Sequence, residues 1–147
     1  MKLATESTVY SLFRATAHLR DAEIAIRYRD NTWSYSELLE IVDRLAHLLR
    51  ELGLKQGERL AILSENRPEY TMLQLACARI GAIVACLNWR LANEELKHCI
   101  DTVAPAAFFV SSRFKDKLAK IDHGSKPTIS IDTCLPTAAR LEKDAGP

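Results

Sequence analysis

The sequence predicts an α/β fold in which helices flank a mostly parallel sheet, preceded by one helix and a β-hairpin. Short apolar runs at 60–63, 82–87 and 106–111 alternate with segments of helical period. The runs show no polar alternation, which is typical of parallel strands covered on both faces. Strands and helices in this order imply βαβ units with right-handed crossovers. The length of 147 residues favours a single domain with its own core.

The first elements are a helix and a strand pair. Residues 8–19 carry Val9, Leu12, Phe13 and Leu19 at helical spacing, which predicts an amphipathic helix with its charged residues facing away. Residues 25–35 then alternate apolar and polar side chains around Asp30 and Asn31, two residues that tolerate the left-handed conformation. They predict a hairpin at the edge of the fold, with a two-residue turn at these positions.

The long helix predicted at 35–52 has clear start and stop signals. Ser34 and Glu37 have the spacing of a capping box, in which each side chain bonds the backbone amide of the other residue. Seven apolar residues between Leu38 and Leu52 form a broad stripe, and Gly53 stands at the usual position of a helix terminator.

The alternating part of the chain follows from residue 60 onward. Pro68 suits the first turn of a helix that ends at Gly81. The remaining predicted elements are a buried strand at 82–87, a helix at 94–103, a strand at 106–111, a charged amphipathic helix at 114–121 and a strand at 128–132. Residues 133–147 show no strong period, so we divide the chain into a domain at 1–132 and an irregular tail at 133–147.

Composition and charge exclude several classes of function. Twenty basic and nineteen acidic residues give a net charge of +1, which does not indicate binding to nucleic acid or to an anionic membrane. The N-terminal residues lack the apolar centre of a signal peptide, and no segment approaches the roughly 20 apolar residues of a membrane span. We therefore expect a cytoplasmic protein without a transmembrane segment. The four cysteines, Cys77, Cys86, Cys99 and Cys134, lack metal-ligand spacing and are expected to be reduced thiols.

Ligands of parallel α/β sheets gather at the carboxyl ends of the strands, which points to the loops 64–67, 88–93 and 111–113. The candidate substrate-binding residues in these loops are Asn66, Arg67, Asn88 and Arg90. Each arginine could bind a carboxylate or phosphate, or could instead bond loop carbonyls. We favour the structural role, because no second anion-binding group stands nearby. For Trp89 we favour a place at the edge of the core over stacking on a ligand.

No catalytic residue or metal site emerges from the sequence. The five glycines are isolated, so no glycine-rich loop can cradle a phosphate. No G-x-S-x-G motif is present, and the four histidines have no visible serine or cysteine partner, which leaves a triad assembled in space as a minor alternative.

Several motifs in combination resemble the AMP-forming acyl-CoA synthetases, a branch of the adenylate-forming superfamily. They are "TWSYSEL", "LKQGERLAIL", "ENRPEY", "GAIVACLNWRLANEEL" and "APAAFFV", within a resemblance that spans residues 8–132. The resemblance implies an incomplete N-terminal subdomain of the adenylate-forming fold. For a complete enzyme it implies ATP, Mg²⁺ and coenzyme A as cofactors. Such an enzyme would convert a carboxylate that resembles a fatty acid into an acyl-adenylate and then into an acyl-CoA.

The family segments that perform this chemistry have no match in the chain. They are the Ser/Thr/Gly-rich phosphate loop, the later adenine-side motif, the ribose-binding aspartate and the C-terminal domain with its catalytic lysine. We therefore expect an N-terminal ligase piece that binds none of these cofactors and is inactive alone. The alternatives are one half of a split ligase with a complementary C-terminal segment, and a stand-alone α/β module for interaction or ligand binding. An independent hydrolase ranks last. An exposed sheet edge would favour self-association of a fragment.

Overall fold

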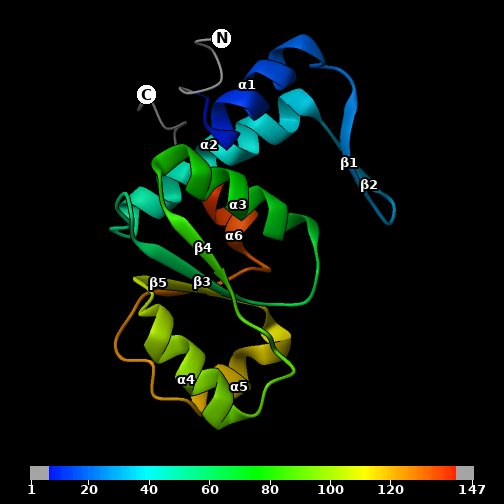
Figure 1. The fold of residues 1–147 in the computed structure, drawn as a ribbon. Coiled ribbons are helices and arrows are strands. Elements are labelled where there is room, and N and C mark those ends of the chain that lie inside the picture. The colour runs from blue at the N-terminus through cyan, green and yellow to red at the C-terminus, as the bar shows by residue number, and fades with distance from the viewer. Residues whose placement is uncertain (1–6, 142–147) are drawn as a thin grey trace.

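Strands and helices alternate through the computed structural model, which describes residues 7–141 (Figure 1). The elements are α1 Val9–Leu19, β1 Ile24–Tyr28, β2 Asn31–Ser34, α2 Tyr35–Glu51, β3 Arg59–Leu63, α3 Pro68–Ile80, β4 Ile83–Cys86, α4 Asn93–Val103, β5 Ala107–Val110, the 3-10 turn η1 Ser112–Phe114, α5 Lys115–Ala119, β6 Thr128–Ser130 and α6 Cys134–Ala138. The α/β class and the order of the predicted elements are confirmed.

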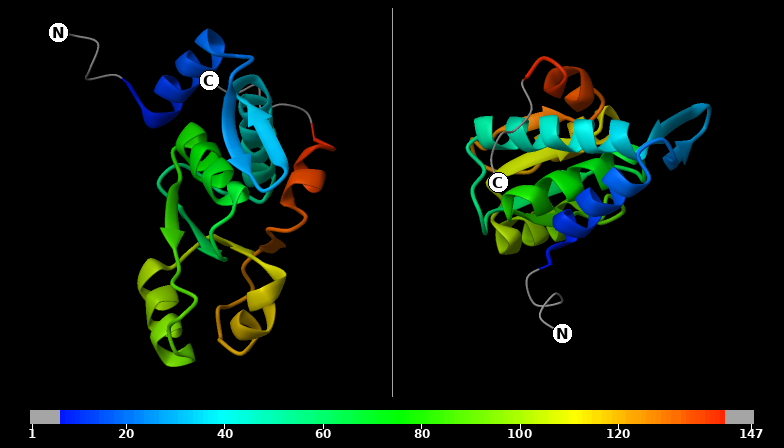
Figure 2. Two further views of the ribbon diagram at one scale, coloured as in Figure 1. Left: turned by 90° about the vertical axis from the view of Figure 1, so that its right-hand side faces the viewer. Right: turned by 90° about the horizontal axis from the view of Figure 1, so that it is seen from above.

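The main sheet is parallel throughout, with the strand order β4-β3-β5-β6. Helices α2, α3 and α6 cover one face, and α4 and α5 cover the other (Figures 1 and 2). Each face has its own apolar cluster: Leu45, Leu49 and Leu73 belong to the first, and Leu96 and Phe114 to the second. The central strands β3 and β5 are buried on both sides, as their unbroken apolar runs predicted.

The cap of α2 has the predicted geometry. Ser34 Oγ accepts a hydrogen bond from the Glu37 amide at 3.2 Å, and Glu37 Oε2 accepts one from the Ser34 amide at 2.8 Å. Gly53 follows the helix with a φ of +83°, a left-handed conformation that a side chain would disfavour. The start and stop signals of this helix are therefore both confirmed.

The hairpin forms, but its turn lies one residue earlier than predicted. Tyr28 pairs with Asn31, so the turn residues are Arg29 and Asp30, and Arg29 takes the left-handed conformation with a φ of +53°. Asn31 begins β2 instead of forming the turn. The two-stranded sheet is separate from the main sheet, in agreement with its predicted peripheral place.

Helix α1 packs through a different face from its predicted apolar stripe. Val9, Leu12 and Leu19 are 67%, 59% and 85% exposed, whereas Tyr10 and Ala17 are buried. Tyr10 fixes this orientation, because its hydroxyl donates to Asp43 Oδ1 of α2 at 2.8 Å and accepts from Arg79 Nη1 of α3 at 2.5 Å. The buried face of α1 is therefore the one that carries this polar network, and three aliphatic side chains of the predicted stripe stay exposed.

Strand β4 was predicted to be buried, and this prediction is wrong. It lies at the edge of the sheet beyond β3, where Ile83 is 53% exposed and Cys86 is also exposed. An edge strand and a buried parallel strand can have the same apolar sequence, because strand order is set by the whole fold and not by local pattern.

The C-terminal segment contains a helix where an irregular tail was predicted. Helix α6 buries Cys134 and Ala138 in the apolar cluster beneath α2 and α3, and Arg44 of α2 donates to the carbonyl oxygens of Ala139 and Leu141 at 3.2 and 2.6 Å. A helix of five residues is too short to show a period in sequence. Residues 142–147 of the predicted tail lie outside the described part of the chain.

The four cysteines are free thiols, as predicted. Burial raises the pKa of Cys77 to about 12, and burial together with the nearby Glu69 carboxylate does the same for Cys134. Both thiols therefore behave as small apolar side chains. Within residues 7–141, no helix is both long and apolar enough to cross a bilayer.

Candidate functional site

The loops after β3 and β5 leave the sheet in opposite directions. The loop after β3 leads to α3 on one face, and the loop after β5 leads to η1 and α5 on the other face (Figure 1). Because β3 and β5 are neighbours, this divergence creates a topological switch point at their carboxyl ends, the usual ligand position in a parallel α/β sheet, and we call the residues that meet there the crevice. Two of the three predicted loops, 64–67 and 111–113, meet at this crevice.

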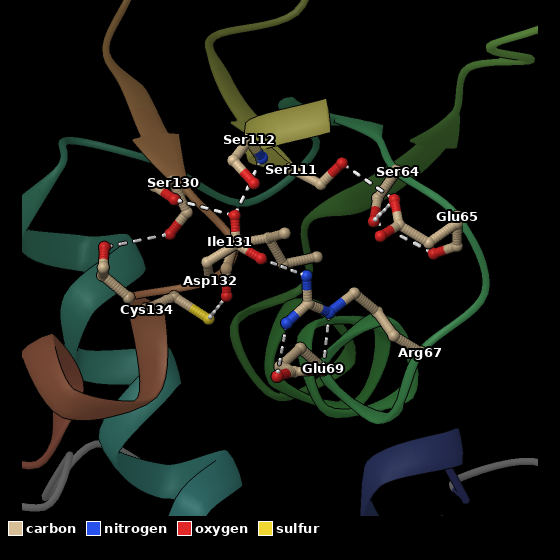
Figure 3. Close-up of polar contacts among 11 residues, drawn as sticks. Ser64, Glu65, Arg67, Glu69, Ser111, Ser112, Ser130, Ile131, Asp132 and Cys134 are labelled. Carbon is tan, nitrogen blue, oxygen red and sulfur yellow. Dashed lines mark hydrogen bonds and ion pairs between the residues drawn. The ribbon is translucent and has the colours of Figure 1, made fainter. Parts of the chain in front are cut away.

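Glu65 spans the crevice from the β3 side (Figure 3). Its Oε2 accepts a hydrogen bond from Ser111 Oγ at 2.8 Å, and Ser64 Oγ lies 3.4 Å from the same oxygen. Ser64 and Ser111 are 4% and 1% exposed and directly follow β3 and β5. The Glu65 carboxylate thus joins the ends of β3 and β5 at the point where the two following loops diverge to opposite faces of the sheet.

Arg67 makes a second crosslink in the same crevice (Figure 3). Its guanidinium binds Glu69 in a bidentate manner, with Nε and Nη2 donating at 2.9 and 3.0 Å, and Nη1 donates to Asp132 Oδ1. Asp132 follows β6, and its Oδ2 accepts from the Ser112 amide at 2.8 Å. The Arg67–Asp132 pair therefore ties together the ends of β3, β5 and β6.

These contacts keep the groups of the crevice ionised. Hydrogen bonding from Arg67 holds the pKa of Asp132 below its usual range, helped by the Ser112 amide. Burial raises the pKa of Glu65, but hydrogen bonds from its own backbone amide and Ser111, with the charges of Arg67 and Arg113, bring it below its usual range. The Glu69 contact raises the pKa of Arg67, which is charged at any physiological pH. Carboxylates of lowered pKa are weak general bases near neutrality.

Asn88 and Arg90 lie in another part of the structure, at the end of β4. Asn88 Oδ1 accepts from the Arg90 amide at 3.0 Å, and Lys117 Nζ of α5 donates to the carbonyl oxygens of Trp89, at 2.9 Å, and Leu91. Trp89 stacks on Phe114 with ring centroids 5.2 Å apart and contacts the α4–α5 cluster. The preference for Trp89 as a core-edge residue agrees with this packing.

The side chain of Arg90 lies over the Trp89 ring, 4.9 Å from its centroid. Arg113 approaches the same ring from the loop after β5, at 5.1 Å. The loop 88–93 is thus held on the face of α5 and not in the crevice. Of the four sequence candidates, Arg67 lies in the crevice, Asn66 is exposed in its loop, and Asn88 and Arg90 are separate from it.

Sequence reasoning missed Glu65, Glu69, Ser111 and Asp132 as members of this site. Glu65 and Asp132 each stand within two residues of a strand's carboxyl end, which was an available signal. Among residues 7–141, no group of three histidine, cysteine or acidic side chains could hold a metal ion. His123 bonds the Ile121 carbonyl through Nδ1 at 2.7 Å and packs against Phe108, so it is engaged away from the crevice.

The fold and its crevice define a parallel α/β unit of the kind that binds small ligands at a topological switch point. The family model described as "AMP-binding enzyme" matches residues 13–146, and the chain belongs to this family. It is 38% identical over 106 residues to indoleacetate–CoA ligase of Aromatoleum aromaticum, covering 72% of this chain and 20% of that protein. It is 30% identical to 2-succinylbenzoate–CoA ligase of Bacillus pumilus, covering 84% of this chain and 24% of that protein.

Solved structures agree on the fold. The N-terminal subdomain of Klebsiella oxytoca NpsA, in complex with 3-hydroxybenzoyl-AMSN, has a TM-score of 0.79 at 20% identity, covering 95% of this chain and 34% of that one. The o-succinylbenzoate CoA synthetase of Bacillus subtilis, in complex with its acyl-adenylate, has a TM-score of 0.76 at 24% identity, covering 88% and 33%. The chain thus corresponds to an N-terminal portion of these enzymes and spans about a fifth to a quarter of its curated relatives.

Proposed function

We propose that this chain is the N-terminal part of a carboxylate–CoA ligase. The complete enzyme would join a carboxylic acid to AMP at the expense of ATP, release pyrophosphate, and pass the acyl group to the thiol of coenzyme A. In this proposal the chain supplies a folded scaffold, acts in the cytoplasm and is inactive alone. The proposal includes the case in which this chain is one half of a split ligase and a separate C-terminal segment is the other half.

The observation that carries the inactivity proposal is the engagement of every ionised group in the crevice. Arg67 is bound by Glu69 and Asp132, and Glu65 is bound by Ser111. An ATP–Mg²⁺ complex needs preorganised donors for its phosphates and oxygen ligands for its metal. The charged crevice residues do not fit these needs, because Arg67 already pairs with Glu69 and Asp132, and Glu65 already accepts from Ser111. We therefore assign no adenylation step to a side chain of this chain.

The acid is proposed to be a fatty acid or an aryl acid. The matched relatives include ligases named for indoleacetate and 2-succinylbenzoate, and the mouse long-chain fatty acid transport protein 6 at 30% identity. These names differ in acyl group while their identities to this chain are similar. The matched segment alone therefore favours carboxylate activation as a class without separating the two kinds of acid.

A chimeric ligase tests the proposal. In the indoleacetate–CoA ligase of A. aromaticum, this chain would replace the segment to which it aligns, and carboxylate-dependent pyrophosphate release would be measured with indoleacetate and with a long-chain fatty acid. The matched control is the same ligase with that segment deleted. We expect activity in the chimera and none in the control. A chimera that is folded by circular dichroism but inactive with both acids would contradict the proposal.

A further inference from the structure

We draw no further inference here: the strongest candidate, the pocket of about 430 Å³ that Arg14, Arg50 and Arg79 line between α1, α2 and α3, carries nothing, because Arg79 is already bound by Tyr10 and Asp43 and nothing in the described part of the chain shows what would fill the pocket.

Discussion

At the scale of single residues, Asp132 is the group that joins the most parts of the crevice. It binds Arg67 from the β3 side and the Ser112 amide from the β5 side. Asp132→Asn removes one charge and weakens both contacts, so we expect a loss of about 2 kcal/mol in the free energy of unfolding. Urea denaturation at neutral pH measures it.

The matched control for this substitution is Asp101→Asn. Asp101 pairs with Lys97 at 2.7 Å, but both side chains are about half exposed, at 55% and 46%. An exposed pair contributes roughly 0–1 kcal/mol, so the control should change stability little. Equal losses of unfolding free energy in the two variants would show that the Asp132 contacts contribute no more than an exposed ion pair.

The pH dependence of stability should report the same contacts. Asp132 and Glu65 have pKa values below their usual ranges in the folded chain. Groups of this kind stabilise the fold above their unfolded pKa values, about 4, and the stabilisation is lost as pH falls through the folded values. Urea midpoints should therefore decline below about pH 4, and Asp132→Asn should flatten that decline. A midpoint whose pH profile the substitution leaves unaltered would contradict the assignment.

The crevice illustrates what can be predicted at the scale of residues. Strand alternation pointed to the loop that holds Arg67, and its guanidinium binds two carboxylates of the chain where bonds to loop carbonyls were expected. A role of Arg67 in substrate binding stays a prediction. Asp132 was missed because its partner lies 65 residues away in sequence. Asn88 and Arg90 were candidates for the same reason as Arg67, but β4 lies at the sheet edge, away from the switch point between β3 and β5.

At the scale of elements, the cap of α2 is the clearest local determinant of structure. Ser34→Ala removes the acceptor for the Glu37 amide and should lower stability by about 1 kcal/mol. Ser34→Thr keeps the hydroxyl and should be close to the parent chain. Thermal unfolding followed by circular dichroism compares the two variants. If the two melted alike, the cap would have no measurable role.

Elements with strong local signals were predicted well, and elements defined by tertiary packing were not. The capping box and the apolar stripe placed α2 within a residue of its observed bounds, Tyr35–Glu51. Helix α6 escaped prediction because its five residues are ordered by packing against the underside of α2. The buried face of α1 was misplaced because Tyr10, with its hydrogen bonds to Asp43 and Arg79, determines which side faces the core.

At the scale of the whole molecule, the alternation of strands and helices predicted a parallel sheet with helices on both faces, and the structure has this architecture. Strand order could not be predicted, because it depends on long-range packing that no local pattern encodes. The motif resemblance proved informative about ancestry, since the AMP-binding enzyme family matches residues 13–146. Because the chain spans 20% and 24% of two matched ligases, the activity of those ligases is a proposal for this chain and not a finding.

The central claim is that this chain is ligase scaffold without adenylating activity of its own. Carboxylate-dependent exchange of radiolabelled pyrophosphate into ATP, measured with the purified 147-residue chain, tests it most directly. The account predicts no exchange above a protein-free blank with either a fatty acid or an aryl acid, while a complete CoA ligase in parallel gives robust exchange. Exchange that requires both the chain and the carboxylate, and that co-purifies with the chain through successive columns, would contradict the account.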